Sequence, residues 1–108
     1  MGLFSKKKPE DKPAFKRKMA ERVCNAKLRY VTEWIDGKEN VICHGGMANI
    51  RDDVLIISAQ DKDIFRCKIN DMKASNLMSL DGTIIEANDL AHDNKYRKIT
   101  AFYVYYRD

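Results

Sequence analysis

Short apolar runs separated by turn residues constrain the fold of this chain more than any other feature. From Leu28 onward, apolar and polar residues alternate over one short stretch after another. Alternation with a period of two is typical of β-strands that bury one face. It is clearest over residues 64–69, where Phe65, Cys67 and Ile69 fall on one face and two basic residues fall on the other. Because no helical period of useful length interrupts these runs, the pattern predicts an antiparallel β-domain.

Glycine-containing dipeptides mark where the strands turn. Asp-Gly occurs twice between apolar runs, at 36–37 and at 81–82. This dipeptide is a strong hairpin signal because both residues tolerate a positive φ. A Gly-Gly pair at 45–46 interrupts the apolar run 41–50 and predicts a bulge or a sharp bend within it.

The remaining runs complete the expected sheet. Residues 54–58 are almost continuously apolar, so we expect both faces of that strand to be covered. We expect a strand at 77–80 before the second Asp-Gly turn, a polar loop at 88–95, and a long last strand at 96–106. The sequence thus predicts a mainly all-β fold, a small antiparallel split barrel or roll of about six or seven strands.

The last strand carries the clearest candidate contact residues. Tyr103 and Tyr105 share a face with Ile99 and Ala101 in an alternating strand. Two tyrosines exposed side by side, with Arg97 nearby, would form a patch for a partner. We therefore predict Tyr103, Tyr105 and Arg97 as partner-binding residues, although core packing is the more common role of strand aromatics.

Charge divides the chain into two parts. Residues 1–30 hold ten Lys or Arg against three Asp or Glu, whereas residues 31–108 hold ten against thirteen. The predicted β-region is therefore slightly acidic, which argues against a basic nucleic-acid-binding face on it. We expect residues 1–12 to form a disordered basic tail and residues 13–108 to form one domain that includes a short N-terminal helix.

The helix is predicted from a thin apolar stripe. Phe15, Met19 and Val23 recur every four residues after Pro13, which suits the first turn of a helix. Such a helix packs on its own domain more often than on a membrane. The basic residues around it, together with the tail lysines, could instead attract an anionic membrane surface. The candidate membrane- or anion-binding residues are Lys6, Lys7, Lys8, Lys12, Lys16, Arg17 and Lys18.

Cysteine usage and motif content favour a non-enzymatic protein. The three cysteines have no Cys-x-x-Cys spacing and predict no disulfide framework, as expected of a cytoplasmic protein. Cys43-His44 with Cys67 and His92 is the only metal-like set, but adjacent strand residues point to opposite faces. We therefore expect no metal and no cofactor. No serine has the context of a nucleophile, and no apolar run is long enough to span a bilayer.

Two segments resemble a known family. Residues 46–58 are similar to a strand pair of bacterial pleckstrin-homology-like and GRAM-like domains, and residues 64–72 are similar to the strand that follows it. The resemblance covers roughly residues 28–106 and implies a binding module for lipid headgroups, peptides or proteins. Those domains end in a helix, whereas this chain ends in a predicted strand, so a helix at 13–26 could fill that place. A PilZ-like or OB-like barrel is the structural alternative.

The leading functional hypothesis is a binding or adaptor module. It would recruit a protein partner or contact the anionic inner surface of the membrane. One alternative is nucleic-acid binding through the basic arm with Arg97, Lys98 and nearby tyrosines, since aromatic and basic side chains together bind single strands. Another is a structural protein that associates through an exposed sheet edge.

Overall fold

The computed structural model describes residues 12–104, so the predicted basic tail lies outside the described residues except for Lys12. One helix and eight strands are found in this part of the chain, together with one short 3-10 turn. In chain order they are α1 (Pro13–Asn25), β1 (Leu28–Ile35), β2 (Lys38–His44), β3 (Met47–Arg51), β4 (Val54–Ala59), β5 (Lys62–Lys68), η3 (Ile69–Asp71), β6 (Lys73–Asn76), β7 (Gly82–Asp89) and β8 (Lys95–Tyr103).

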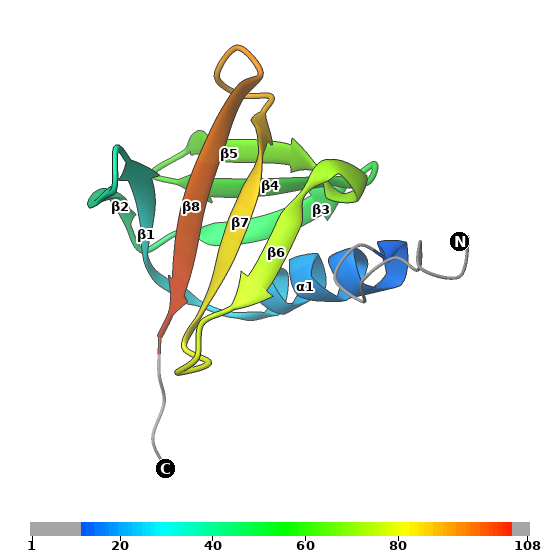
Figure 1. The fold of residues 1–108 in the computed structure, drawn as a ribbon, viewed down its shortest axis with the longest axis horizontal. Coiled ribbons are helices and arrows are strands. Elements are labelled where there is room, and N and C mark those ends of the chain that lie inside the picture. Colours follow the sequence, from blue (N-terminus) through cyan, green and yellow to red (C-terminus); the bar gives the residue numbers. More distant parts are fainter. Residues whose placement is uncertain (1–11, 105–108) are drawn as a thin grey trace, which may run out of the picture.

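The strands form two antiparallel sheets that cross one another (Figure 1). The larger sheet has the order β2-β1-β8-β7-β6, and the smaller sheet has the order β3-β4-β5. The prediction of a mainly all-β antiparallel roll is confirmed. The strand count is slightly higher than expected, because the run 41–50 forms parts of two strands, β2 and β3, one in each sheet.

The Gly-Gly pair moves the chain from one sheet to the other. β2 ends at His44 in the large sheet, and β3 begins at Met47 in the small one. Gly46 has a φ of +113°, and a Cβ there would lie 2.9 Å from the carbonyl oxygen of Ser58. Only glycine fits such a position, since an L side chain would be both strained and in collision. The predicted bend is therefore confirmed.

Helix α1 covers the side of the roll between β3, η3 and β6 (Figure 1). Its first turn contains Pro13, and its buried residues are Met19, Ala20 and Val23, with Phe15 partly buried against the same core. The predicted stripe thus packs on its own domain. Because its apolar side is used in this way, the helix has no second apolar face to offer to a membrane.

The core lies between the two sheets. Its largest fully buried side chains include Phe65, Leu55 and Ile57 from the small sheet, and Ile85 and Ile99 from the large one. The predicted alternation of β5 is confirmed, since Phe65 is buried along with Cys67 and Ile69. Burial of these faces provides most of the favourable free energy of folding.

Several predicted boundaries are wrong for identifiable reasons. β4 buries only the face of Leu55, Ile57 and Ala59, because no further layer covers its other face completely. Residues 77–80 are not a strand but part of a five-residue turn between β6 and β7. The polar loop is shorter than predicted, since β7 continues to Asp89 and β8 begins at Lys95. Among residues 12–104, no helix is both long and apolar enough to cross a membrane.

Candidate functional site

The outer face of the large sheet carries a row of aromatic side chains. On β8, Ile99 and Ala101 are buried in the core, so the alternate residues Tyr96 and Phe102 point outward. On β1 the outward residues include Tyr30, which is paired with Phe102. The two rings stack with their centroids 4.6 Å apart. This spacing is typical of favourable aromatic pairs.

The same face becomes more exposed toward the β1–β2 hairpin. Trp34 is 40% exposed, Val41 51% and Tyr96 57%. Lys98 lies between these residues, with its amine 5.9 Å from the centroid of the Trp34 ring. Trp and Tyr in such partly exposed positions are the residue types that dominate binding energy at protein interfaces. The aromatic face, as we call it below, consists of Tyr30, Trp34, Val41, Ile84, Tyr96 and Phe102.

The charges around the aromatic face are nearly balanced. Lys98 lies 4.0 Å from the carboxylate of Glu86, its cross-strand neighbour, and Lys73 is opposite Glu86 in the register of β6 and β7. Glu39 accepts a hydrogen bond from Thr32 at 2.6 Å. The guanidinium of Arg29 lies 5.9 Å from the centroid of the Tyr30 ring. A surface that binds the phosphate backbone of nucleic acids carries a larger excess of basic groups.

The residues predicted to contact a partner are not on this face. Tyr103 is only 9% exposed, because its side chain points into the core beside Ile99 and Ala101. Its hydroxyl forms a hydrogen bond with the hydroxyl of Thr83. The predicted alternation of β8 is thus correct, but the condition that Tyr103 be exposed is not met. Tyr105 lies outside the described residues.

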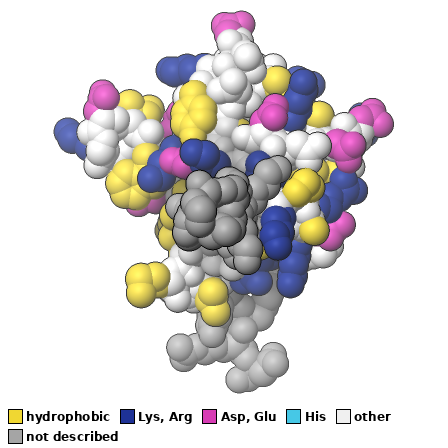
Figure 2. Space-filling view, turned by 45° about the vertical axis from the view of Figure 1, so that its right-hand side comes forward, with side chains coloured by type: hydrophobic (Ala, Val, Ile, Leu, Met, Phe, Trp, Pro, Cys, Tyr) yellow, Lys and Arg dark blue, Asp and Glu magenta, His cyan; other side chains and the backbone are white. Residues whose placement is uncertain are grey.

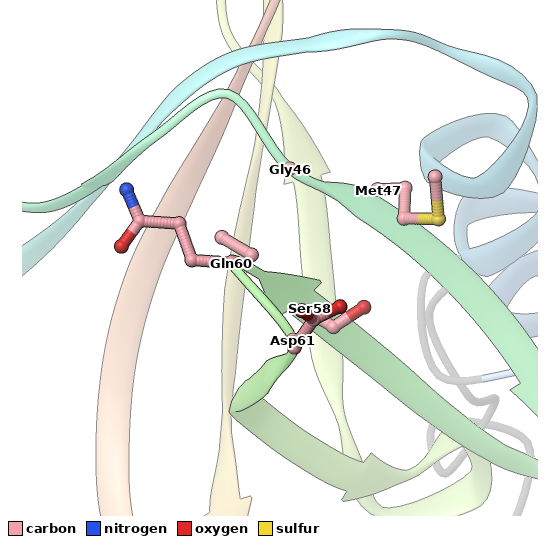
Figure 3. A pocket seen from close by; sticks show the side chains of 6 residues that line it. Gly46, Met47, Ser58, Gln60 and Asp61 are labelled. Atoms are coloured by element: carbon pink, nitrogen blue, oxygen red, sulfur yellow. The ribbon is translucent and has the colours of Figure 1, made fainter.

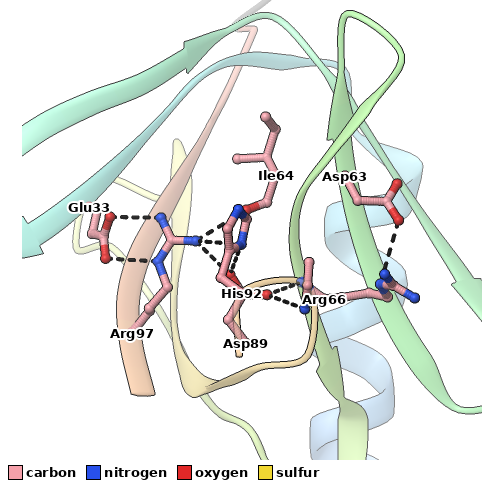
Figure 4. A network of polar contacts seen from close by, with 8 residues as sticks. Glu33, Asp63, Ile64, Arg66, Asp89, His92 and Arg97 are labelled. Carbon is pink, nitrogen blue, oxygen red and sulfur yellow. Dashed lines mark hydrogen bonds and ion pairs between the residues drawn. The ribbon is translucent and has the colours of Figure 1, made fainter. Parts of the chain in front are cut away.

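Arg97 lies in a nearly buried ionic cluster (Figure 4). Its Nε and Nη2 donate to the two carboxylate oxygens of Glu33, at 2.8 and 2.7 Å. Its Nη1 donates to Asp89 at 2.5 Å and to the carbonyl oxygen of Ile64 at 3.2 Å. Planar, bidentate pairing of this kind is among the strongest polar contacts in proteins. Because these acceptors use its donors, Arg97 is not available to an external phosphate or partner.

Asp89 is the fully buried centre of this cluster. It accepts hydrogen bonds from the backbone N–H groups of Arg66 and Ala91, and its Oδ2 lies 2.6 Å from Nδ1 of His92. Burial alone would raise the pKa of Asp89, but the hydrogen bonds from Arg97 and from these backbone groups lower it overall. The hydrogen bond from Arg97 likewise lowers the pKa of Glu33. Both carboxylates are therefore held in the charged form.

The ionic cluster joins the two sheets. Arg66 belongs to β5 of the small sheet, whereas Asp89 and Arg97 belong to the large one. A backbone hydrogen bond of 2.7 Å from Leu90 to the carbonyl oxygen of Arg66 reinforces the junction. The sequence does not predict this cluster, because Asp89 falls within the predicted polar loop 88–95. The one sign of it in the sequence is an acidic residue that continues the alternation of Thr83, Ile85 and Ala87 at an inward position.

The basic residues predicted on α1 are partly engaged within the domain. Lys16 donates to the carbonyl oxygen of Asn70 at 2.8 Å, and Arg17 pairs with Asp53 at 2.8 Å and with Glu21 at 3.5 Å. Lys12 and Lys18 are exposed. The predicted residues Lys6, Lys7 and Lys8 lie outside the described residues.

The cysteines and a shallow pocket complete the candidate sites. Burial raises the pKa of Cys67 to about 12, and it also raises those of Cys24 and Cys43. Reactive cysteines have the opposite shift. Within residues 12–104, no three His, Cys, Asp or Glu side chains are placed to share a metal ion.

A pocket of about 310 Å³ opens beside the bend between β2 and β3 (Figure 3). Its polar side chains are those of Ser58, Gln60 and Asp61, and the last two are exposed at the β4–β5 turn. Ligand sites usually enclose most of the ligand and converge a few polar groups on it. This pocket is shallow, and we assign no ligand to it. The residues that line it are Gly46, Met47, Ser58, Ala59, Gln60 and Asp61.

No protein-family model, curated protein sequence or solved structure matches this chain.

Proposed function

We propose that this protein is a non-enzymatic binding module that holds a protein partner on its aromatic face. The observation that carries the proposal is the exposure of Trp34, Val41 and Tyr96 on one continuous face of the large sheet. A stable domain gains nothing from leaving these side chains in water, and their burial by a partner would be favourable. Exposed groups of large apolar residues commonly mark interaction sites.

Charge favours a protein over a nucleic acid as the partner. Beside the aromatic face, Lys98 pairs with Glu86, and Arg97 is enclosed by Glu33 and Asp89. A single-stranded nucleic acid would need uncompensated basic groups between the aromatic rings. A protein interface instead requires an apolar centre with a balanced polar rim.

The cysteine environments support a non-catalytic role and a reducing compartment. The three thiols are free and their pKa values are raised, so none is activated as a nucleophile. Free thiols are usual in cytoplasmic proteins, and we place this module in a bacterial-type cytoplasm. The pleckstrin-homology-like interpretation remains part of the proposal.

The test compares binding by two exposed-residue variants. Binding proteins captured with the full chain are identified and purified, and their affinities are measured by titration calorimetry. We expect Trp34→Ala combined with Tyr96→Ala to weaken binding by at least about tenfold, because such residues each contribute on the order of 2 kcal/mol at interface centres. The matched control is Met47→Ala, which truncates an exposed apolar residue of the small sheet.

Equal affinity of the wild type and the Trp34 and Tyr96 variant for every captured protein would refute the proposal. A second copy of this chain is the alternative occupant. Light scattering of the purified protein distinguishes it, since a dimer that the same two substitutions dissociate would identify the partner as the chain itself.

A further inference from the structure

The turn between β6 and β7 exposes apolar side chains at its tip. Met78 is fully exposed and Leu80 is 61% exposed. Figure 2 shows hydrophobic side chains protruding from the lower part of the domain. This is the level at which Figure 1 places the turn between β6 and β7. Loop tips of soluble proteins are usually small and polar. A tip with two exposed large apolar residues therefore needs another explanation.

Backbone hydrogen bonds close this turn. The N–H of Leu77 donates to the carbonyl oxygen of Gly82 at 3.0 Å, and the N–H of Leu80 donates to that of Leu77 at 2.9 Å. Leu80 has a φ of +63°, a left-handed conformation that glycine or asparagine adopts at much lower cost. A leucine that is both strained and exposed contributes little to the fold, and strain of this kind is often found at functional sites.

Basic residues lie at the same end of the domain as the tip. Arg22, in the last turn of α1, donates to the carbonyl oxygen of Leu80 at 3.2 Å. Lys27 is two backbone hydrogen bonds away: its carbonyl oxygen accepts the N–H of Val104, and the N–H of the preceding Tyr103 donates to the carbonyl oxygen of Asp81. Arg29 follows at the start of β1, and all three basic side chains are exposed. The one carboxylate of the turn, Asp81, accepts a hydrogen bond from the hydroxyl of Ser79.

We propose that this end of the domain docks on an anionic lipid surface, with Met78 and Leu80 inserted at the headgroup level. Arg22, Lys27 and Arg29 then lie close to the lipid phosphates. Shallow apolar insertion combined with several basic groups is the usual composition of a peripheral membrane contact. The charge of the surrounding residues selects a negatively charged bilayer rather than an apolar protein surface.

The membrane contact lies away from the exposed part of the aromatic face, Trp34, Val41 and Tyr96, although Phe102 of that face pairs with Gly82 beside the tip. The tip lies where β7 begins and β8 ends, whereas Trp34 and Tyr96 lie toward the other ends of β1 and β8. The domain could therefore hold a protein partner and a membrane at the same time. The Trp34 and Tyr96 variant tests the protein partner, and the Met78 and Leu80 variant tests the membrane contact. Either proposal can therefore fail without affecting the other.

The test is co-sedimentation of the full chain with vesicles made of equal parts phosphatidylcholine and phosphatidylserine. We expect Met78→Ser combined with Leu80→Ser to reduce the partition coefficient by about tenfold or more, because two apolar side chains no longer leave water. We expect Arg22→Gln with Lys27→Gln to reduce it by a similar factor. Binding of the wild type should weaken as salt is added and should be far weaker on pure phosphatidylcholine.

Matched controls come from the opposite end of the large sheet. Ile35→Ser with Leu90→Ser replaces two exposed apolar side chains, and Lys38→Gln with Lys95→Gln removes two exposed charges. Both controls should bind the vesicles as the wild type does. The tail lysines are present in every variant, so a contact made by the tail alone would leave the tip variant at wild-type binding.

Fluorescence tests insertion directly. Trp34 is the only tryptophan of the chain, so Trp34→Phe with Met78→Trp places a single reporter at the tip. Its emission should shift to shorter wavelength when anionic vesicles are added, whereas the emission of wild-type Trp34 should stay unchanged. The proposal is overturned if the tip variant sediments like the wild type, if the tip reporter does not shift, or if the vesicles bind all variants equally.

Discussion

The two ends of β7 and β8 show opposite uses of side chains. At one end, the ionic cluster of Glu33, Asp89 and Arg97 places charges inside the domain and satisfies each of them (Figure 4). At the other end, the turn after β6 places Met78 and Leu80 outside and leaves them uncovered. Buried charges that are fully paired hold the sheets in one arrangement. Exposed apolar groups on a strained turn offer no such benefit, which is why we associate the second end with binding.

The largest effect is expected when Arg97 is replaced. Arg97→Met leaves Glu33 and Asp89 without their main partner in a nearly buried site. We expect the free energy of unfolding to fall by about 3–5 kcal/mol, the usual cost of breaking a buried ion pair on one side. Urea denaturation measures the change. The control is Lys98→Met, which removes a surface ion pair with a distance of 4.0 Å to Glu86. If both variants lost the same free energy of unfolding, the ionic cluster would have no structural role.

Packing beneath the tip gives the next largest effect. A Cβ on Gly82 would lie 2.8 Å from Cδ1 of Leu77 and 2.9 Å from the carbonyl oxygen of Ala101. Gly82→Ala should therefore destabilise the domain by about 1–3 kcal/mol, since the backbone of β8 must shift. Gly37→Ala is the control, because nothing lies within 4 Å of its Cβ and only the positive φ opposes it. Thermal unfolding should show the smaller loss for the Gly37 variant.

The pH dependence of stability tests whether Glu33 and Asp89 stabilise the fold in their charged form. The pKa values of Glu33 and Asp89 are lower in the folded state than their ordinary values of 4.5 and 3.8. The unfolded state then binds more protons, so their contribution is fully present above about pH 5 and is lost as the pH falls through the folded pKa values. The urea midpoint of unfolding should therefore fall as the pH is lowered from 7, and it should fall less steeply in Glu33→Gln. If the midpoints of the two proteins fell equally with pH, Glu33 would not contribute to the loss of stability in acid.

The smallest effect is expected at the tip itself, and its sign is opposite. Leu80→Gly relieves the left-handed backbone at φ +63°. We expect it to leave stability unchanged or to raise it by up to about 1 kcal/mol, because glycine adopts this conformation without strain. The same change should weaken vesicle binding. A marked loss of stability would mean that Leu80 is retained for the fold rather than for binding.

The strand pattern of this protein could be predicted from its sequence because it depends on local properties. Alternation fixed which side chains of β5 and β8 share a face, and Asp-Gly and Gly-Gly marked the hairpin after β1 and the bend after β2. The apolar stripe of α1 was equally local, since its spacing follows from the helical repeat. Residues 77–80 were misread as a strand because a short apolar run has the same appearance in a strand and in an exposed turn.

Which face of each strand turns inward was decided only by the tertiary structure. Tyr103 and Phe102 are both aromatic in the sequence, and the packing of the large sheet against the small sheet and α1 buries the face of Tyr103 and leaves that of Phe102 outward. The pairing of Arg97 with Glu33 and Asp89 joins residues up to 64 positions apart in the chain. Alternation is a property of neighbouring residues, whereas burial and ion pairing depend on which distant strands meet, and this depends on the packing of the whole chain.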